Sequence, residues 1–173
     1  MARHAAISDG SMRMKGNALP WLLISLIVVI SDQLTKMLVV QNLSVHAAIE
    51  VISGLLNWNL AYNTGAAFSF LADQDGWQRW ILSLLAVIVS LALSIWLWRI
   101  PRGDWRTALP LALIIGGAVG NLIDRIRLGK VIDFIQVYYQ DWFWPSFNIA
   151  DSAISIGAIL LLWFGLRAQR SQT

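Results

Sequence analysis

Residues 107–125 read TALPLALIIGGAVGNLIDR, an apolar run that ends in an asparagine, an aspartate and an arginine. A helix that crosses a bilayer needs about 20 mostly apolar residues. The chain has 173 residues, of which 57% are hydrophobic and 13% are charged, far from the balance of a soluble domain. Four stretches are predicted to span a membrane: Leu19–Val40, Trp80–Trp98, Thr107–Ile123 and Ile149–Leu166. The sequence therefore predicts an α-helical integral membrane protein with one four-span domain at 19–166, an N-terminal segment at 1–18 and a tail at 167–173.

Basic residues predict the orientation of these spans. Eight of the thirteen lysines and arginines lie before the first span, between the second and third spans, or in the tail: Arg3, Arg13, Lys15, Arg99, Arg102, Arg106, Arg167 and Arg170. The positive-inside rule makes this side cytoplasmic, so both termini face in and residues 41–79 and 124–148 face out. The tryptophans lie near both ends of the spans, as in an aromatic belt. The net charge of +3 thus reflects topology, and no basic cluster indicates binding to nucleic acid.

The first span also has features of a cleavable signal peptide, because Arg13 and Lys15 precede its apolar run. No small-residue cleavage site follows, and the apolar pattern resumes through Met37–Val40. We therefore interpret it as a retained anchor. Met12 is a second possible start, and residues 1–11 are left out of the interpretation of the fold.

Composition excludes most hydrolytic chemistries. The sequence has no cysteine, which removes disulfides, thiol nucleophiles and thiolate metal sites. Its two histidines, His4 and His46, lie far apart and outside the spans, so an HExxH zinc site is excluded. Neither Lys36 nor Lys130 belongs to an S-x-x-K motif. Carboxylates remain as the catalytic candidates, and no metal or cofactor is expected.

The outer segments are predicted to form a small sheet at the membrane surface. Residues 49–63, IEVISGLLNWNLAYN, mix β-branched and aromatic residues with turn-formers at Ser53-Gly54, which predicts two short strands. Residues 130–139, KVIDFIQVYY, predict a third strand. The small residues of NTGAAFSF (63–70) indicate a close approach of the backbone to another group. A conformational gate around residues 63–76 is a further hypothesis.

Two N-x-x-D units meet the outer interface from consecutive spans. Asn121 and Asp124 are spaced i, i+3 at the end of the third span, and Asn148 and Asp151 repeat this spacing at the start of the fourth. Residues with this spacing share one face of a helix. Helices joined by a loop usually lie side by side. Asp124 and Asp151 are therefore predicted to face one another across a cleft.

Each aspartate also has a structural interpretation. Asn148 is a suitable N-cap, Asp151 suits the helix dipole, and Asp124 has Arg127 three residues on as a partner. An ionisable group at membrane depth is by default a functional hypothesis, and the presence of two favours function. Two carboxylates that share a site cannot both ionise cheaply. One can take a proton from water while the other protonates a carbonyl oxygen, which is aspartyl peptide hydrolysis.

Five motifs carry a resemblance to a known family: DQLTK (32–36), NTGAAFS (63–69), GGAVGNLIDR (116–125), VIDF (131–134) and FNIAD (147–151). With these motifs in this order, the chain resembles the lipoprotein signal peptidases (signal peptidase II). These bacterial membrane aspartyl proteases remove signal peptides from prolipoproteins. The resemblance runs from about Leu19 to Leu166.

The resemblance implies a site and a substrate. The catalytic dyad would be Asp124 and Asp151, and the expected substrate contacts are Asn63, Gly65, Asn121, Arg125 and Asn148. The implied substrate is a prolipoprotein with a diacylglyceryl-modified cysteine, cleaved just before that cysteine, with membrane lipid as the other partner. No cofactor and no obligate protein partner are expected. The implied location is the bacterial cytoplasmic membrane, with the active site near its outer face. The implied fold is four transmembrane helices with an outer β-cradle and a short outer helix.

Other marked residues are interpreted mainly as structural. Asp32 and Lys36 are spaced i, i+4 and are expected to neutralise each other, with support of the active site as the alternative. The GxxxG of residues 116–120 favours close helix packing. Asp133 is interpreted as a carboxylate that holds the sheet, with a third catalytic acid as the alternative. The remaining acids of the outer segments are interpreted as solvated charges: Glu50, Asp73, Asp75 and Asp141.

Two other classes of function compete with a peptidase. A small transporter or channel would use carboxylates within the membrane to relay protons or bind cations. Against it, both aspartates of the N-x-x-D units lie near one surface, and no charged residue lines the inner halves of spans two to four. A lipid-binding or scaffold protein would have no need of paired acids. Cleavage of a lipidated precursor by the purified protein distinguishes the three classes.

Overall fold

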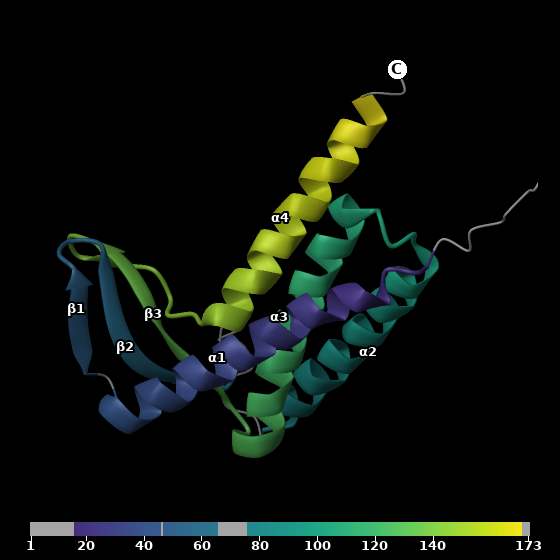
Figure 1. Ribbon diagram of the computed structural model, residues 1–173. Helices are drawn as coiled ribbons and strands as arrows, with labels where there is room; N and C mark the ends of the chain where they lie inside the picture. The colour runs from purple at the N-terminus through teal and green to yellow at the C-terminus, as the bar shows by residue number, and fades with distance from the viewer. Residues whose placement is uncertain (1–15, 46, 66–75, 171–173) are drawn as a thin grey trace, which may run out of the picture.

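The computed structural model describes residues 16–45, 47–65 and 76–170. Its elements are η1 (Leu19–Trp21), α1 (Leu22–Asn42), β1 (Ala48–Ile52), β2 (Leu56–Asn63), α2 (Trp77–Arg99), α3 (Trp105–Leu128), β3 (Val131–Tyr139), β4 (Trp142–Phe143) and α4 (Ile149–Arg170). The long helices α1 to α4 form a bundle, and Figure 1 shows the small sheet to one side of it, next to the C-terminal end of α1. Figure 1 also places the start of α1, the α2–α3 connection and the C-terminal end of α4 at the end of the bundle away from the sheet.

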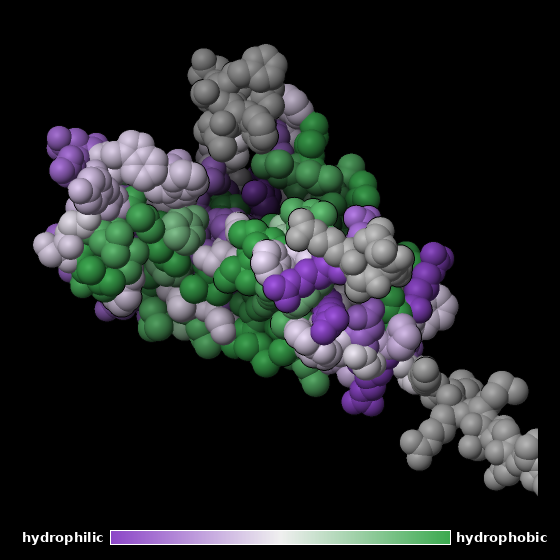
Figure 2. Space-filling model, turned by 90° about the horizontal axis from the view of Figure 1, so that it is seen from above, coloured by the Kyte–Doolittle hydropathy of each residue, from purple (hydrophilic) through white to green (hydrophobic). Residues whose placement is uncertain are grey.

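All four long helices are long and apolar enough to cross a membrane, which confirms the four predicted spans. Helix α3 is the centre of the bundle because it packs against α1, α2 and α4. In its most apolar window 61% of residues are buried, against 6% for α2, so α2 turns most of its apolar side chains outward. Figure 2 shows broad hydrophobic surface, with hydrophilic side chains gathered near the C-terminal end of α4.

Helix α3 extends further than predicted. It continues past Ile123 to Leu128 and ends at Gly129, whose φ of 72° is a left-handed conformation that glycine adopts readily. The Gly129 N–H donates to the carbonyl of Arg125. Asp124 therefore belongs to the helix, as its predicted shared face with Asn121 requires, and the helix continues into residues 125–128, which the sequence assigned to an outer segment. The polar side chains did not end the helix because they find partners on α1 and β3.

Small residues of α3 permit close contact with two neighbouring helices. A Cβ on Gly116 would lie 2.8 Å from the carbonyl oxygen of Ser25 in α1, which confirms the packing role predicted for the GxxxG. A Cβ on Gly117 would clash with the carbonyl oxygen of Ala150 in α4. The sequence did not predict this second contact because Gly117 lies outside the GxxxG spacing. Without these glycines, α3 would not approach both neighbours closely enough to bring their polar ends together.

The sheet has the order β1-β2-β3-β4 and is antiparallel throughout. Its first three strands confirm the prediction, whereas the two-residue β4 is too short to leave a sequence signal. A hydrophobic cluster of Val39, Leu60, Ile132 and Phe134 fixes the sheet to the end of α1. The start of β3 therefore lies against the helix ends that carry the polar motifs.

The structure departs from, or does not test, the predictions for the acids, the gate and the short helix of the outer segments. Glu50 lies on β1 and is not simply solvated: it accepts hydrogen bonds from the Tyr138 hydroxyl and the Gly54 N–H, which lower the pKa of the Glu50 carboxyl. Asp73, Asp75 and most of the hypothetical gate lie outside the described residues. Residues 16–45, 47–65 and 76–170 contain no separate short helix in the outer segments.

Candidate active site

Asn148 and Asp151 cap the N-terminus of α4. The Asn148 Oδ1 accepts a hydrogen bond from the Asp151 N–H at 2.9 Å, and the Asp151 Oδ2 accepts one from the Asn148 N–H at 3.3 Å. This reciprocal pair is a capping box, in which two side chains satisfy N–H groups that a helix start leaves free. The predicted N-cap role of Asn148 is confirmed. The capping box also fixes the direction in which the Asp151 carboxylate leaves the helix.

Asn121 connects three helices at this point. Its Nδ2 donates to the Asp151 Oδ1 at 2.7 Å, and its Oδ1 accepts from the Asn148 Nδ2 and the Lys36 Nζ, both at 3.1 Å. Asn121 is 5% exposed and Asn148 is fully buried. Both amides are thus held by protein groups and orient Asp151. Direct contact of either amide with a substrate stays a prediction, and the observed contacts favour the orienting role.

Lys36 is a buried cation shared by two acids. Its ammonium lies 2.7 Å from an oxygen of Asp32 and 2.7 Å from an oxygen of Asp124, and the side chain is almost completely buried. The predicted pairing with Asp32 is confirmed. The contact with Asp124 joins α1 to α3, and spacing along the chain gave no sign of it. Asp32 also accepts a hydrogen bond from the Ala150 N–H at 2.9 Å, so it contributes to the N-terminal cap of α4.

The Asp124 carboxylate contacts three donor groups. Besides Lys36, its carboxylate accepts hydrogen bonds from the Gln33 Nε2 at 2.9 Å and from the Ile132 N–H at 3.2 Å. The side chain is 3% exposed. Its partner is Lys36 on another helix and not Arg127, as the structural interpretation of the sequence had suggested. Asp124 therefore ties the end of α3 to α1 and to the first residues of β3.

Asp133 on β3 is the third acid of the cluster, and it differs from Asp124 in its neighbours. Its oxygens accept hydrogen bonds from two neutral amides, the Asn148 Nδ2 at 2.8 Å and the Asn63 Nδ2 at 3.1 Å. Burial, followed by the negative charge of Asp151, raises the pKa of Asp133 to about 6. A like charge raises the pKa of a carboxyl only when the two groups are near each other. Asp133 and Asp151 therefore form an interacting acid pair.

Arg125 and Gly65 lie at the border of this cluster. Arg125 is half-buried, and its guanidinium interacts electrostatically with Asp151, Asp133 and Asp124, most strongly with Asp151. Gly65 has a φ of +93°, and a Cβ there would lie 2.8 Å from a methyl group of Leu82. The predicted close approach of the backbone is confirmed at Gly65.

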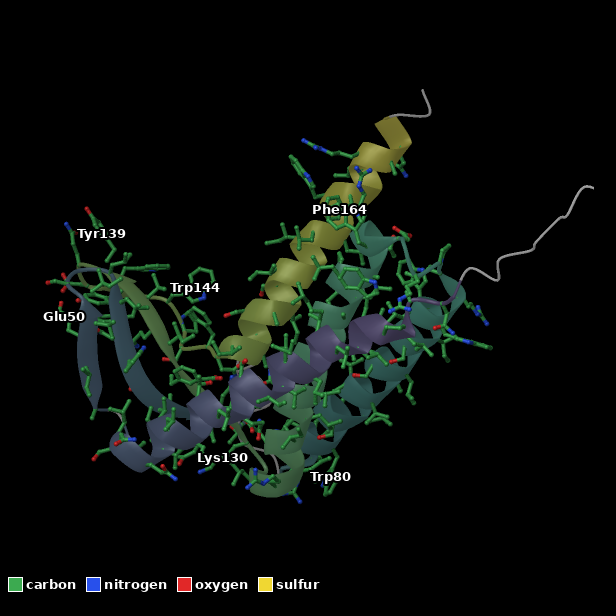
Figure 3. All side chains as sticks on the ribbon, viewed as in Figure 1. Glu50, Trp80, Lys130, Tyr139, Trp144 and Phe164 are labelled. Atoms are coloured by element: carbon green, nitrogen blue, oxygen red, sulfur yellow. The ribbon has the colours of Figure 1, made fainter. Side chains whose placement is uncertain are left out.

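The sheet side of the site is held by β2 and β3. The Asn63 Oδ1 accepts a hydrogen bond from the Gly65 N–H at 2.8 Å, while its Nδ2 reaches Asp133. Lys130, at the lower end of α3 in Figure 3, places its ammonium 3.6 Å from the centre of the Tyr62 ring. These contacts fix the turn between α3 and β3, so the position of Asp133 depends on both strands.

The geometry favours Asp133 over Asp124 as the partner of Asp151. Within the described part of the chain no hydrogen bond joins Asp151 directly to either acid: Asn148 alone links it to Asp133, whereas Lys36 and Asn121 link it to Asp124. To accept a proton from water, Asp124 would have to give up part of its bond to an ammonium group. Among the described residues the hydrogen-bond donors to Asp133 are two neutral amides, and its carboxyl interacts with the negative charge of Asp151. The repeated N-x-x-D spacing drew attention to Asp124, whereas Asp133, in the VIDF motif, was considered only as an alternative, a third catalytic acid.

A pocket of about 370 Å³ opens beside the Lys36–Asp124 ion pair, between α1 and the end of α3. Its wall is apolar at Met37 and Val40, with Arg127 at its edge. Residues 16–45, 47–65 and 76–170 contain no group of three or more His, Asp or Glu side chains arranged to hold a metal ion. The carboxylates of the site form hydrogen bonds with side-chain amides and backbone N–H groups, and two of them form ion pairs with Lys36.

Comparison with known proteins identifies the family. A family model described as signal peptidase (SPase) II matches residues 24–167. The chain belongs to the signal peptidase II family. A lipoprotein signal peptidase of Pseudomonas aeruginosa (strain UCBPP-PA14) is 51% identical over 154 residues, which cover 88% of this chain and 91% of the relative. A lipoprotein signal peptidase of Xanthomonas campestris pv. campestris (strain 8004) is 54% identical over 156 residues, which cover 90% and 93%.

Solved structures agree with this family. A bacterial membrane enzyme determined by the in meso method at 2.3 Å resolution matches with a TM-score of 0.80 and 30% identity, over 92% of this chain and 94% of that one. A second such enzyme, at 1.9 Å resolution, matches with a TM-score of 0.77 and 31% identity, over 89% and 98%. The predicted family, the four-helix membrane fold with a sheet and the class of protease are confirmed. This signal peptidase II family member is a multi-pass membrane protein.

Proposed function

We propose that this chain removes signal peptides from prolipoproteins that carry a diacylglyceryl-modified cysteine, cleaving just before that cysteine. The names of its relatives support the class of substrate. We further propose that both termini are cytoplasmic and that the enzyme resides in the bacterial cytoplasmic membrane. The excess of basic residues at the chain ends and in the α2–α3 connection supports this orientation. The acid cluster would then face the outer side of that membrane.

We infer that Asp133 and Asp151 activate the attacking water. The observation that carries this inference is that Asn148 bridges the two acids, since its Nδ2 donates to Asp133 and its Oδ1 accepts from the Asp151 N–H; burial and the charge of Asp151 also raise the pKa of Asp133 to about 6. The ionised carboxylate takes a proton from the water as its oxygen bonds to the scissile carbonyl carbon. The other carboxyl gives its proton to the carbonyl oxygen, which forms a neutral tetrahedral intermediate. Collapse of that intermediate breaks the C–N bond: the carboxyl that took a proton from water gives it to the departing amine, and the other carboxylate takes a proton from one hydroxyl of the intermediate, which becomes the carboxyl product.

Asp124 remains the competing assignment for the second acid, because the family motif first indicated it. Its contacts with Lys36 and the Ile132 N–H support a different role, in which it fixes the junction of α1, α3 and β3. The half-buried Arg125 suits contact with a substrate carbonyl, since its fixed charge lies beside the acid pair. Asn63 and Gly65 are proposed to position the peptide from the sheet side.

The lipid is proposed to determine the local concentration of substrate. With acids near the membrane interface, the acyl chains can stay in the bilayer while the peptide reaches the site. Each buried CH₂ group contributes about 0.8 kcal/mol to partitioning into a membrane. A precursor without the diacylglyceryl group should therefore be cleaved poorly.

The test uses the purified full chain and a lipidated precursor peptide. Asp133→Asn and Asp151→Asn are each expected to abolish cleavage, because Asn keeps the shape but cannot exchange a proton. The double variant should be hardly worse than either single variant, since residues that act as a unit are not additive. Asp124→Asn should retain measurable cleavage once its folding has been checked by thermal unfolding. Full activity of Asp133→Asn together with an inactive, folded Asp124→Asn would instead assign the second acid to Asp124.

A further inference from the structure

A surface pocket lies at the end of the bundle opposite the acid cluster, between the start of α1 and the α2–α3 connection. The segment before α1 pairs with the α2–α3 connection: the Ala18 N–H donates to the Ile100 carbonyl at 3.1 Å, and the Arg102 N–H donates to the Gly16 carbonyl at 2.8 Å. The Trp21 indole N–H donates to the Arg102 carbonyl at 3.2 Å. These contacts fix residue 102 against the start of α1, beside this open surface pocket of about 380 Å³.

One side of this pocket is apolar and continuous with the membrane-facing surface. It is lined by Pro20, Trp21, Leu23 and Ile24. Leu23 is 64% exposed, and the exposed stripe continues along α1 through Ile27, Ile30 and Leu34. These positions follow the i, i+4, i+7, i+11 spacing of one helix face. An acyl chain can therefore extend from the pocket along α1.

The other side of the pocket carries an arginine with a free guanidinium in the described part of the chain. The two hydrogen bonds that Arg102 makes with described residues use its backbone atoms, and none of the ion pairs among those residues includes it. The one acid of the connection, Asp104, accepts a hydrogen bond from the Thr107 N–H and caps α3. Two further arginines flank this connection: Arg99 is the last residue of α2, and Arg106 lies in the first turn of α3. The pocket thus combines excess positive charge with an apolar wall.

We propose that this pocket binds an anionic glycerophospholipid, with the lipid phosphate on the Arg102 guanidinium and one acyl chain along Leu23. The guanidinium presents several N–H donors that match a phosphate group. Basic pockets beside transmembrane helices on the cytoplasmic side are suited to such headgroups. A tryptophan at the same level is typical of the membrane–water interface. A soluble anion would leave the exposed apolar wall unused, so the charge and the wall together point to a lipid.

The test measures lipid binding by the purified full chain in detergent. Phosphatidylglycerol and phosphatidylcholine with identical acyl chains are titrated, and bound lipid is counted by native mass spectrometry. The wild-type chain is expected to prefer phosphatidylglycerol. Arg102→Gln should weaken binding of that lipid about fivefold, the size expected for one basic residue at an anionic surface. The matched control is Arg99→Gln, which removes the same charge from the same end of the bundle but does not line the pocket.

Each outcome is decisive. Arg102→Gln keeps the backbone bonds of residue 102, and an unchanged unfolding temperature in lipid-free detergent verifies its fold. A change of less than about twofold for Arg99→Gln supports a defined site, since general surface charge would act on both variants alike. Equal losses in the two variants would mean that only general surface charge acts, and would overturn the proposal. Equal binding of the two lipids, or displacement by inorganic phosphate at the same concentration, would overturn it as well.

Discussion

The proton on Asp133 offers a direct test of which acids form the pair. Burial and the charge of Asp151 raise the pKa of Asp133 from 3.8 to about 6 in the folded chain. The folded state therefore binds the proton more tightly than the unfolded state does. The stability that this proton contributes is complete below the unfolded pKa and is lost as the pH rises through about 6. A shift of about two pKa units corresponds to about 3 kcal/mol.

The experiment compares the free energy of unfolding of the wild-type chain with that of Asp133→Asn between about pH 4 and pH 8, in a mixed detergent that unfolds the chain reversibly. The wild type should lose about 2.5 kcal/mol relative to the Asn variant over this range, since part of the full contribution is already lost at pH 4. The largest slope is expected between the unfolded pKa and about pH 6. Parallel curves for the two proteins would refute the raised pKa and, with it, the argument for the pair.

The same comparison in two further variants identifies the neighbouring acid that raises the pKa of Asp133. The charge of Asp151 is the second cause of the raised pKa, after burial, and Asp124 is not among the causes. The pH-dependent difference should therefore shrink when the comparison is repeated in an Asp151→Asn chain. It should keep its size in an Asp124→Asn chain. The reverse pattern would show that Asp133 interacts with Asp124 and would contradict the proposed pair.

Packing and topology give three other tests. Lys36→Met leaves two buried carboxylates without their cation, so unfolding in detergent should show a loss of about 3–5 kcal/mol, and no loss would contradict the ion-pair geometry. Gly117→Ala brings a methyl group into a clash with the Ala150 carbonyl and should cost about 1–3 kcal/mol, whereas Gly103→Ala, with nothing within 4 Å, serves as the neutral control. Because the chain lacks cysteine, single cysteines can report topology. A cysteine at Ser53 should be labelled from the outside and one at Gly103 should not; labelling of Gly103 from the outside would contradict the proposed orientation.

The spans could be predicted because membrane helices leave a strong signal in sequence. An apolar run of about 20 residues is rare outside membrane spans, and the glycines of α3 marked where helices pack. The predicted third span stopped at Ile123 because polar residues usually mark the membrane interface, whereas α3 continues to Leu128. Asp124 stays helical since its carboxylate finds Lys36, Gln33 and the Ile132 N–H, and the first two of these partners come from a distant part of the chain.

The acid pair was harder to predict because it joins residues from elements of different kinds. Asp151 lies on a helix whose cap is a recognisable motif, whereas Asp133 lies on a strand in which alternate residues face opposite sides. Spacing on one element cannot show which residue of another element faces it. The link between the two runs through Asn148, whose side chain caps α4 and also donates to Asp133. Such a second contact of a capping residue depends on the folded arrangement and leaves no mark in the local sequence.

The contacts of the pair also indicate which acid holds the shared proton. Asp151 lies in the first turn of α4, and its carboxylate accepts hydrogen bonds from the Asn148 N–H and from Asn121. The N-terminus of a helix favours negative charge. Asp133 lies on a strand, where its donors among the described residues are two neutral amides and there is no such dipole. When one proton is shared between interacting acids, it resides more on the acid whose charged form is less stabilised. We therefore propose that Asp133 is the proton donor to the substrate carbonyl and that Asp151 is the base that receives a proton from water.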